Sequence, residues 1–279
     1  MTKTRRGGAG ERPRCSTARL VALAALAGTI ALAAPREAAP QDMMRGIDLS
    51  SLEMTTAEMS RSDVEAALKA ASAERPADFT GKRLSSLNLS GLDFSGAILR
   101  AARLNHADLS RANLSGAVLD QAWALGANLT DASLVKASLF GAQLAGARLD
   151  GADLREARIA ADLNGARLVN ARLDGADCSA DEKNQSMGLM RASFKSADLD
   201  GAHLTRANLA LADLSFVKAR AADFSGAVLR DADASGADLR SARFDGADVT
   251  GLDLDSARID AAAAPLLAKA ANLDRASRE

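Results

Sequence analysis

A period of five residues runs through most of this 279-residue chain and restricts what it can fold into. Between Ala107 and Leu119 the sequence reads ADLSRANLSGAVL. Leucine recurs there at every fifth position, and an alanine lies two residues before each leucine. On an α-helix, leucines at this spacing would lie about 140° apart and form no apolar stripe. On a straight β-strand, an odd period would point alternate leucines to opposite faces. Alanine and leucine both face inward only if the chain is extended for about three residues and then turns a corner in every repeat.

The period continues from residue 77 to residue 259 with two interruptions. When the leucine position is taken as the centre of each repeat, there are 36 centres, of which 24 are leucine and five are phenylalanine. Alanine lies two residues before the centre in 30 of these 36 repeats. Because only 3% of the residues are aromatic, the core must consist of narrow, repeated layers of small side chains.

The repeats resemble those of the pentapeptide-repeat proteins, whose motif is A-[D/N]-L-x-x. Close matches are 152–156 (ADLRE), 197–201 (ADLDG) and 207–211 (ANLAL). The resemblance implies an all-β fold, a right-handed quadrilateral β-helix over residues 77–260 in which four pentapeptides complete one coil. The 36 repeats would then form nine coils. The buried core would include the centres Leu109, Leu114, Leu119, Leu129, Leu134, Leu139, Leu154, Leu199, Leu204 and Leu209.

The N-terminal segment has the pattern of a secretory signal peptide, assigned here to residues 1–34. Basic residues precede an uncharged apolar run at 20–34, and small residues close that run. We therefore expect export to the periplasm or beyond, with no membrane span in the mature chain, because the run is shorter than the roughly 20 residues of a spanning helix. An uncleaved anchor is an alternative. Initiation at Met43 or Met44 would instead leave the protein in the cytoplasm.

Residues 35–76 are predicted to form a linker and an N-terminal capping helix. Ser62 is followed three residues later by Glu65, the spacing of a capping box. Apolar residues beyond it form a helical stripe: Val64, Ala67, Leu68 and Ala71. Arg75-Pro76 is expected to end the helix. Such a helix would cover the exposed end of the first coil.

Residues 261–279 are predicted to close the other end. Pro265 suits the first turn of a helix, in which Leu266, Ala270 and Leu273 would share one face. This segment is expected to be either a C-terminal capping helix or a dimerisation element, so a homodimer through the C-terminal end is an alternative.

The period breaks at two places in the middle of the chain. One residue is missing between the centres Ile159 and Leu163, and the spacing from Cys178 to Leu189 is more than twice the usual one. The six additional residues are assigned to a charged loop, which is either a tolerated surface insertion or a partner contact. The candidate contact residues of this loop are Asp181, Glu182, Lys183, Asn184 and Gln185, followed by Ser186.

Trp123 is a further irregularity, since it occupies a position that should face outward. Leu125 and Phe140 also occupy outward positions, and Ile98 and Val118 should stack on a neighbouring face. The sequence therefore predicts an apolar surface patch at Trp123, Leu125 and Phe140 that contacts a protein partner. The alternative is a local distortion of the coil that turns Trp123 inward.

The sequence contains no pattern that indicates catalysis. His106 and His203 stand alone, and no nucleophile–base pair, phosphate-binding glycine loop or metal-ligand spacing is present. Asp153, Arg172 and Asp198 should stack on one face as a surface ladder of alternating charge. We expect no enzymatic activity, no cofactor and no metal site.

The charge balance bears on the choice of partner. The net charge of −1 gives no basis for direct nucleic-acid binding. The lead hypothesis is an exported, non-enzymatic scaffold or protein-interaction module with an unknown protein partner. A cytoplasmic DNA mimic that binds DNA gyrase, as the resemblance implies for some members, is the first alternative, although arginines occupy outward positions where a mimic needs carboxylates. A structural spacer without a specific partner is the second.

Overall fold

The computed structural model describes residues 48–180 and 191–278. Its helices and strands are α1 (Leu52–Thr55), α2 (Arg61–Ala70), β1 (Arg258–Ile259), the 3-10 helices η2 (Ala261–Ala263) and η3 (Leu273–Arg275), and β2 (Ser277–Arg278). The predicted signal peptide, the start of the 35–76 linker and the charged loop lie outside the described residues.

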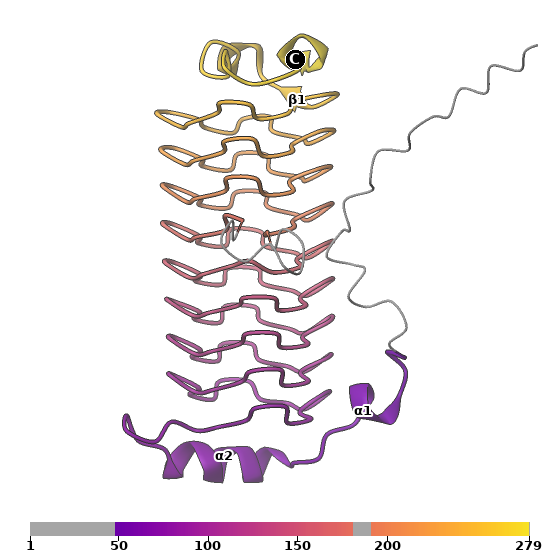
Figure 1. Ribbon diagram of the computed structural model, residues 1–279, viewed down its shortest axis with the longest axis vertical. Helices are drawn as coiled ribbons and strands as arrows, with labels where there is room; N and C mark the ends of the chain where they lie inside the picture. The colour runs from indigo at the N-terminus through magenta and orange to yellow at the C-terminus, as the bar shows by residue number, and fades with distance from the viewer. Residues whose placement is uncertain (1–47, 181–190, 279) are drawn as a thin grey trace, which may run out of the picture. The chain divides into compact units, whose positions relative to one another are not determined.

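Between these elements the chain winds into a stack of coils joined by single-residue parallel β-bridges (Figure 1). Along most of the stack a bridge joins residues 20 apart, as from Asp78 to Ile98 and from Ile98 to Val118. Twenty residues are four repeats, so four repeats complete one coil. The prediction of an all-β solenoid is confirmed.

The bridges form four columns, one on each face of the solenoid. We number the faces by the residue at which each column begins: Asp78 for the first, Arg83 for the second, Asn88 for the third and Asp93 for the fourth. Except for Ala271 in the C-terminal segment, the bridging residue in every column directly precedes a repeat centre. Its side chain therefore points away from the core, because neighbouring side chains of an extended chain point to opposite sides.

The core is a column of inward-facing leucine and alanine side chains. The ten core leucines named from the sequence are at most 1% exposed. The rings of Phe224 and Phe244, one coil apart, stack with centroids 5.4 Å apart. Since burying one leucine contributes about 1.5–3 kcal/mol, this column is the main source of stability.

The aspartate or asparagine of the motif has a local role at the corners. The Asp78 carboxylate accepts a hydrogen bond from the N–H of Thr80 at 2.8 Å, and Asp213 accepts one from the N–H of Ser215 at 3.0 Å. Neither N–H donates to a neighbouring coil. A short side chain with an acceptor oxygen thus satisfies a backbone group that the ladder leaves unpaired.

Most corners also contain one residue in the left-handed region, two residues after the centre. Gly146 has a φ of +67°, and a Cβ there would meet open space. Gly236 has a φ of +66°, but a Cβ there would lie 2.6 Å from the ring of Phe216, one coil earlier. At Gly236 the glycine therefore provides both the backbone conformation and the room for a neighbouring side chain.

The two breaks in the period affect the stack differently. At the corner between Ile159 and Leu163 the chain is one residue shorter, and Gln143 pairs with Asp162, one position earlier than the regular period would give. After Cys178 the next bridging residue is Ser193, which pairs with Asp162 on the second face.

The second break is larger than the sequence spacing predicted. Asp177 and Ser193 belong to consecutive faces, so everything between them beyond one repeat is insertion. The insertion is therefore longer than predicted by one full repeat. The predicted repeat centre Leu189 lies outside the described residues. In the predicted ladder, the step from Asp153 to Arg172 is confirmed and the step from Arg172 to Asp198 is wrong.

The longer insertion changes which residues follow one another along a face. On the fourth face Asp153 pairs with Arg172, as expected, but the next residue is His203. Asp198 instead pairs with Arg167 on the third face.

Helix α2 covers one end of the solenoid, with a different cap from the predicted one. Ser60 is the N-cap: its hydroxyl accepts from the Asp63 N–H at 3.2 Å, and the Asp63 carboxylate accepts from the Ser60 N–H at 2.8 Å. The predicted capping box of Ser62 and Glu65 is wrong, because Glu65 pairs with Arg61 at 2.8 Å.

The predicted apolar stripe of α2 does face the solenoid. Val64 is fully buried, and Ala67, Leu68 and Ala71 pack against the core. The helix ends at Ala70, earlier than the Arg75-Pro76 boundary predicted from the sequence.

The C-terminal segment covers the other end without forming the predicted α-helix. Its only helical turns within 261–278 are η2 and η3, and β2 pairs in parallel with β1. Leu267 is the buried apolar residue of this segment, whereas Leu266 is 48% exposed. A helix that continues to Leu273 is not compatible with this arrangement, because the N–H of Ala271 donates to the Leu252 carbonyl and its carbonyl accepts from Leu254, as a further coil would.

Candidate interaction surface

Trp123 lies on the second face within a regular ladder. It bridges Arg103 in the previous coil and Gln143 in the next. The backbone N–H of Trp123 donates to the Ala102 carbonyl at 2.8 Å, and the backbone carbonyl of Trp123 accepts from the Leu104 N–H at 2.6 Å. The coil is thus not distorted, and the half-buried indole lies on the outer side of the solenoid.

Leu125 and Phe140 flank this position at the two corners of the second face. Both are half-buried. The Leu125 N–H donates to the Asn105 side chain at 3.0 Å, and the guanidinium of Arg158 lies 4.9 Å from the centre of the Phe140 ring. The predicted apolar patch is therefore only partly accessible, with Trp123 between its two other members.

The start of the second face is covered by the segment that contains α1. Glu53 lies 3.4 Å from Arg103, and Glu58 lies 3.6 Å from Arg83. The Asn105 side chain donates to the Met54 carbonyl at 3.1 Å and is only 4% exposed. The accessible part of this face therefore begins after Asn105. From the sequence, this segment is predicted only as part of the linker and capping helix of residues 35–76.

Polar side chains are buried beyond Trp123 on the same face. Gln143, Asp162 and Ser193 are at most 4% exposed. Burial raises the pKa of the Asp162 carboxyl, because it disfavours the charged form, although the Asn164 N–H donates to that carboxyl at 2.9 Å. The Gln143 Oε1 atom accepts no hydrogen bond within the described structure.

The rest of the second face is acidic. Asp213, Asp233 and Asp253 follow one another in three successive coils. Each carboxylate accepts the N–H of the residue two positions later, so part of its hydrogen-bonding capacity is used at the corner. One face thus runs from a basic, covered start through Trp123 to a column of carboxylates.

Some surface features were not singled out by the sequence analysis. The large apolar side chains with the highest exposure in the described ranges are Leu49, Leu52, Phe216 and Leu266. Phe216 is 58% exposed and lies at a corner position more often filled by a small or polar residue. That unusual residue type was the available signal. The predicted loop contacts Asp181, Glu182, Lys183, Asn184 and Gln185 lie outside the described residues.

The described residues form no group of three or more histidines, cysteines or carboxylates that could hold a metal ion. Cys178 is buried, which raises the pKa of its thiol and disfavours the reactive thiolate. His106 and His203 are both exposed; His106 lies at a corner, and His203 belongs to the fourth face.

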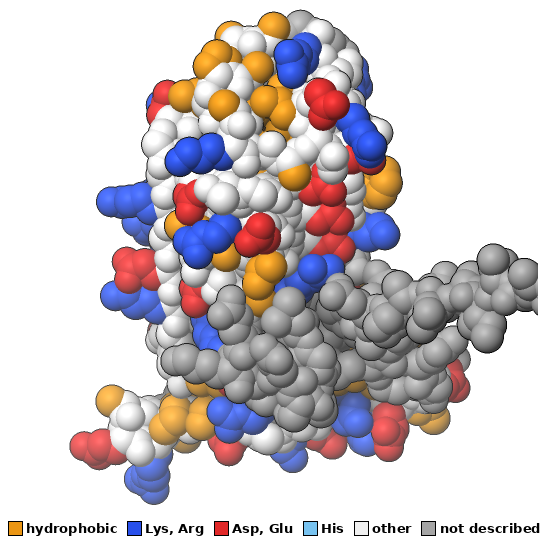
Figure 2. All heavy atoms as spheres, turned by 45° about the horizontal axis from the view of Figure 1, so that its top comes forward, with side chains coloured by type: hydrophobic (Ala, Val, Ile, Leu, Met, Phe, Trp, Pro, Cys, Tyr) orange, Lys and Arg blue, Asp and Glu red, His pale blue; other side chains and the backbone are white. Residues whose placement is uncertain are grey.

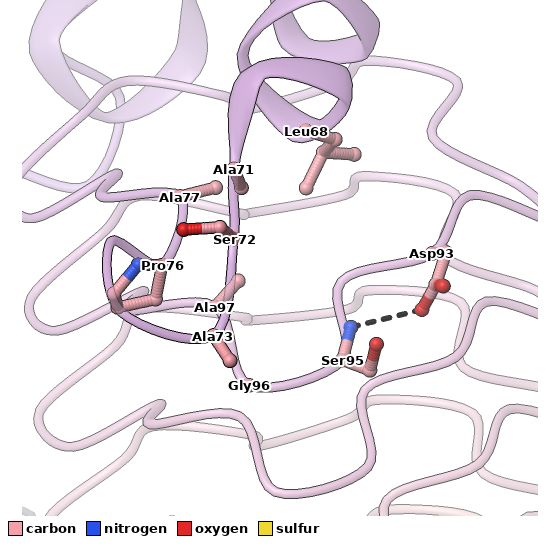
Figure 3. Close-up of a pocket in the computed structure, with 10 residues that line it drawn as sticks. All are labelled: Leu68, Ala71, Ser72, Ala73, Pro76, Ala77, Asp93, Ser95, Gly96 and Ala97. Atoms are coloured by element: carbon pink, nitrogen blue, oxygen red, sulfur yellow. Dashed lines mark hydrogen bonds between the residues drawn. The ribbon is translucent and has the colours of Figure 1, made fainter.

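A cavity of about 520 Å³ lies between the end of α2 and the first coil (Figure 3). Small side chains such as Ala71, Ala73 and Ala97 line much of it. Its carboxylate, Asp93, accepts hydrogen bonds from the Ser95 N–H at 3.0 Å and from the Asn113 amide at 2.9 Å. This cavity brings together no acid–base or nucleophile pair.

No helix in ranges 48–180 and 191–278 has the length and apolar character needed to cross a bilayer.

The chain matches a known family. A profile described as Pentapeptide repeats matches in eight copies, over residues 77–116, 112–151, 125–159, 189–226 and 222–259. These matches together span more than half of the chain. A search of curated proteins found no match.

Solved structures of repeat proteins are also similar. HetL, a pentapeptide repeat protein involved in heterocyst differentiation regulation from the cyanobacterium Nostoc sp. strain PCC 7120, is 29% identical, with 72% of this chain and 97% of HetL covered and a TM-score of 0.36. QnrB1, a plasmid-mediated fluoroquinolone resistance protein, is 20% identical, with 68% and 88% covered and a TM-score of 0.39. Rfr23 from the cyanobacterium Cyanothece 51142 is 19% identical, with 79% and 100% covered and a TM-score of 0.21.

Proposed function

The chain belongs to the pentapeptide-repeat family, and from this premise we propose that it is a non-enzymatic scaffold that binds a protein partner through the second face around Trp123. The observation that carries the proposal is the position of Trp123, on the outer side of a regular coil and half-accessible. Tryptophan is enriched among the residues that dominate binding energy at protein interfaces. The rigid coils hold it in place, so little conformational entropy is lost on binding.

Site-specific photo-crosslinking tests this surface. A photoreactive amino acid replaces Trp123 in one variant and Ser133 in another, which lies on the fourth face of the same coil. We expect a partner to be crosslinked from position 123 and not from position 133. In a pull-down, Trp123→Ala should lose the same partner and Ser133→Ala should retain it. Equal recovery with both alanine variants would mean that the Trp123 surface is not the contact.

We further propose that the protein acts after export, in the bacterial envelope. Support comes from the basic residues, apolar run and small residues within 1–34. N-terminal sequencing of the mature protein tests this proposal: a mature chain beginning shortly after residue 34 is expected. A chain beginning at Met1 would contradict cleavage, and a chain beginning at Met43 or Met44 would contradict export.

Gyrase binding by DNA mimicry is the alternative function. The column of Asp213, Asp233 and Asp253 favours it, because stacked carboxylates are what a duplex mimic needs. Arginine–carboxylate pairs elsewhere on the surface oppose it, such as Arg167 with Asp150 at 3.1 Å. A supercoiling assay with purified gyrase, with and without a quinolone, distinguishes the two. Protection of gyrase by the full chain would favour the mimic.

Two further alternatives remain predictions. A spacer without a specific partner would yield no crosslink from either position 123 or position 133. If the protein forms a homodimer through the C-terminal end, its apparent molecular mass in sedimentation equilibrium should rise with protein concentration.

A further inference from the structure

The last coil has an unpaired backbone edge. Its second and third faces are closed by the C-terminal segment: the Leu254 N–H donates to the Ala271 carbonyl at 3.1 Å, and the Ser277 N–H donates to the Ala257 carbonyl at 2.7 Å. Within residues 191–278, however, the N–H groups of Phe244, Gly246 and Val249 donate no hydrogen bond, and the carbonyls of Ala242 and Ala247 accept none.

The same five groups one coil earlier are all paired. The N–H groups of Phe224, Gly226 and Leu229 donate to the next coil at 2.8–2.9 Å, and the carbonyls of Ala222 and Ala227 each accept at 2.9 Å. The unpaired groups of residues 242–249 therefore have the hydrogen-bonding pattern of a coil that lacks its neighbour. We call residues 242–249 the open edge.

Apolar surface accompanies these polar groups. Ala242 and Ala247 are half-buried, whereas Ala237 and Ala257 of the third face are 0% exposed. Figure 2, in which the C-terminal end comes forward, shows hydrophobic side chains gathered at this end. Leu266, 48% exposed, lines a cavity of about 500 Å³ beside the open edge.

The cavity lining includes a cationic side chain without an ion-pair partner in the described structure. Lys269 lines the cavity and forms no ion pair in the described structure. The other charged residue of the lining, Asp248, is already paired with Arg230 at 3.3 Å and accepts from the Thr250 N–H at 3.2 Å. A bound segment that carries a carboxylate would therefore complement Lys269.

We propose that the open edge binds an extended peptide segment of a partner protein by β-strand addition. The peptide backbone pairs with the five free groups, an apolar side chain covers Ala247 and Leu266, and an acidic side chain faces Lys269. A peptide that is extended along each face and turns at the corner beside Gly246 can satisfy these donors and acceptors, and it also buries the apolar surface beside them. The open edge is separate from the Trp123 surface, so each proposal can fail without the other.

A second solenoid does not fit this edge as a further coil. At the C-terminal end, Ala271 and Ser277 already pair with the second and third faces. At the other end, Arg61 donates to the Asn88 carbonyl at 2.9 Å, and Glu58 pairs with the backbone of Arg83. End-to-end stacking of two copies would require both caps to be displaced.

Peptide binding to the full chain tests the proposal. The probe is a fluorescein-labelled peptide of residues 222–231 (ADFSGAVLRD), which in the protein spans the same two faces one coil earlier. Fluorescence anisotropy should show saturable binding that weakens about tenfold for Leu266→Asp. Leu52→Asp, at an apolar residue that is 75% exposed near the N-terminal cap, is the matched control and should bind normally.

Two measurements separate strand addition from nonspecific apolar contact. Peptides N-methylated at the backbone positions that pair should lose binding, and hydrogen exchange at Phe244, Gly246 and Val249 should slow when the unmodified peptide binds. Equal affinity of the methylated peptide, or unchanged exchange, would overturn the proposal. Binding that is lost in Trp123→Ala but kept in Leu266→Asp would assign the peptide to the second face. Self-association that is lost in Leu266→Asp would assign the edge to a second copy.

Discussion

The interior of the solenoid is uniform, whereas its corners differ from one another. Inside, alanine and leucine recur from coil to coil, and most are at most 1% exposed. At the corners, the same left-handed position is filled by residues as different as Gly146, Asp131, Arg206 and Phe216. An interior side chain is enclosed by the coils above and below, but a corner residue must only adopt the required backbone conformation.

This difference separates the fold from the function. The interior determines that the chain forms a solenoid, and it has little freedom to vary. The faces and corners place side chains such as Trp123 at defined heights along that solenoid. Substitutions in the two regions should therefore differ in cost, and the following experiments measure that difference.

The largest contrast is expected between Leu129 and its neighbour Thr130. Leu129 is 1% exposed, so Leu129→Asp buries a carboxylate without a partner and should destabilise the fold by at least about 4 kcal/mol. Thr130→Ala removes one hydroxyl hydrogen bond to Asn128 and should cost about 0.5 kcal/mol. Urea unfolding monitored by circular dichroism measures both. Equal midpoints would contradict the inward assignment of the leucine column.

Acid should weaken the corners, because their carboxylates are stabilised in the charged form. Hydrogen bonds from Thr80 lower the pKa of Asp78, and those from Arg155 lower the pKa of Asp153. A carboxyl group whose pKa is lowered by folding stabilises the fold above its unfolded pKa, and this contribution is lost as the pH falls through the folded pKa. The free energy of unfolding should therefore drop below about pH 4.

Urea unfolding over a pH series from about 7 to about 2 checks this expectation. Asp78→Asn keeps an acceptor oxygen but cannot titrate, so this variant should lose less stability on acidification than the parent chain. A parent protein that becomes more stable in acid would contradict the proposed role of the corner carboxylates.

Two corner glycines should differ although their φ angles are alike. Gly146→Ala should lower the free energy of unfolding by about 1–2 kcal/mol, because alanine disfavours the left-handed backbone conformation. Gly236→Ala should cost up to about 1 kcal/mol more, because its Cβ displaces the Phe216 ring. In a Phe216→Ala background this excess should vanish, as a double-mutant cycle will measure. A persistent excess would mean that the backbone, and not the ring, restricts Gly236.

The smallest effect, of opposite sign, is expected at Asp162. Burial raises the pKa of this carboxyl, so stability falls as the pH rises through the folded pKa, and the charged form is disfavoured at neutral pH. Asp162→Asn keeps the acceptor for the Asn164 N–H and should stabilise the protein at pH 7 by about 1 kcal/mol or less. Asp153→Asn, which removes the ion pair with Arg155, should destabilise it. Thermal melts of both variants at pH 7 provide the measurement, and a lower melting temperature for Asp162→Asn would contradict the desolvation argument.

The predictions that the structure contradicts all concern places where the five-residue period stops. Ser62 and Glu65 have the spacing of a capping box, but Ser60 and Asp63 form it. With Ser60 as the cap, Arg61 in the first turn reaches the Asn88 carbonyl of the first coil. The local spacing pointed to Ser62, whereas the observed cap places Arg61 for a contact 27 residues away in the chain.

The size of the insertion after Cys178 could not be read from spacing alone. In the sequence, Leu189 is in phase with the later repeats. In the structure, however, Asp162 on the second face pairs with Ser193, so the regular ladder resumes at Ser193. That pairing joins neighbouring coils, so it is a tertiary property. The same distinction applies to the candidate site. The outward position of Trp123 follows from the five-residue period, but the ion pair by which Glu53 covers Arg103 on that face does not.

By itself, the sequence determined the solenoid, its leucine column and the outward positions, because a five-residue apolar period has few physical solutions. Only the tertiary structure decided how the ends are closed, which residues succeed one another after the insertion, and which backbone groups remain free at the open edge. These features depend on contacts between segments distant in the chain, and no local period encodes them.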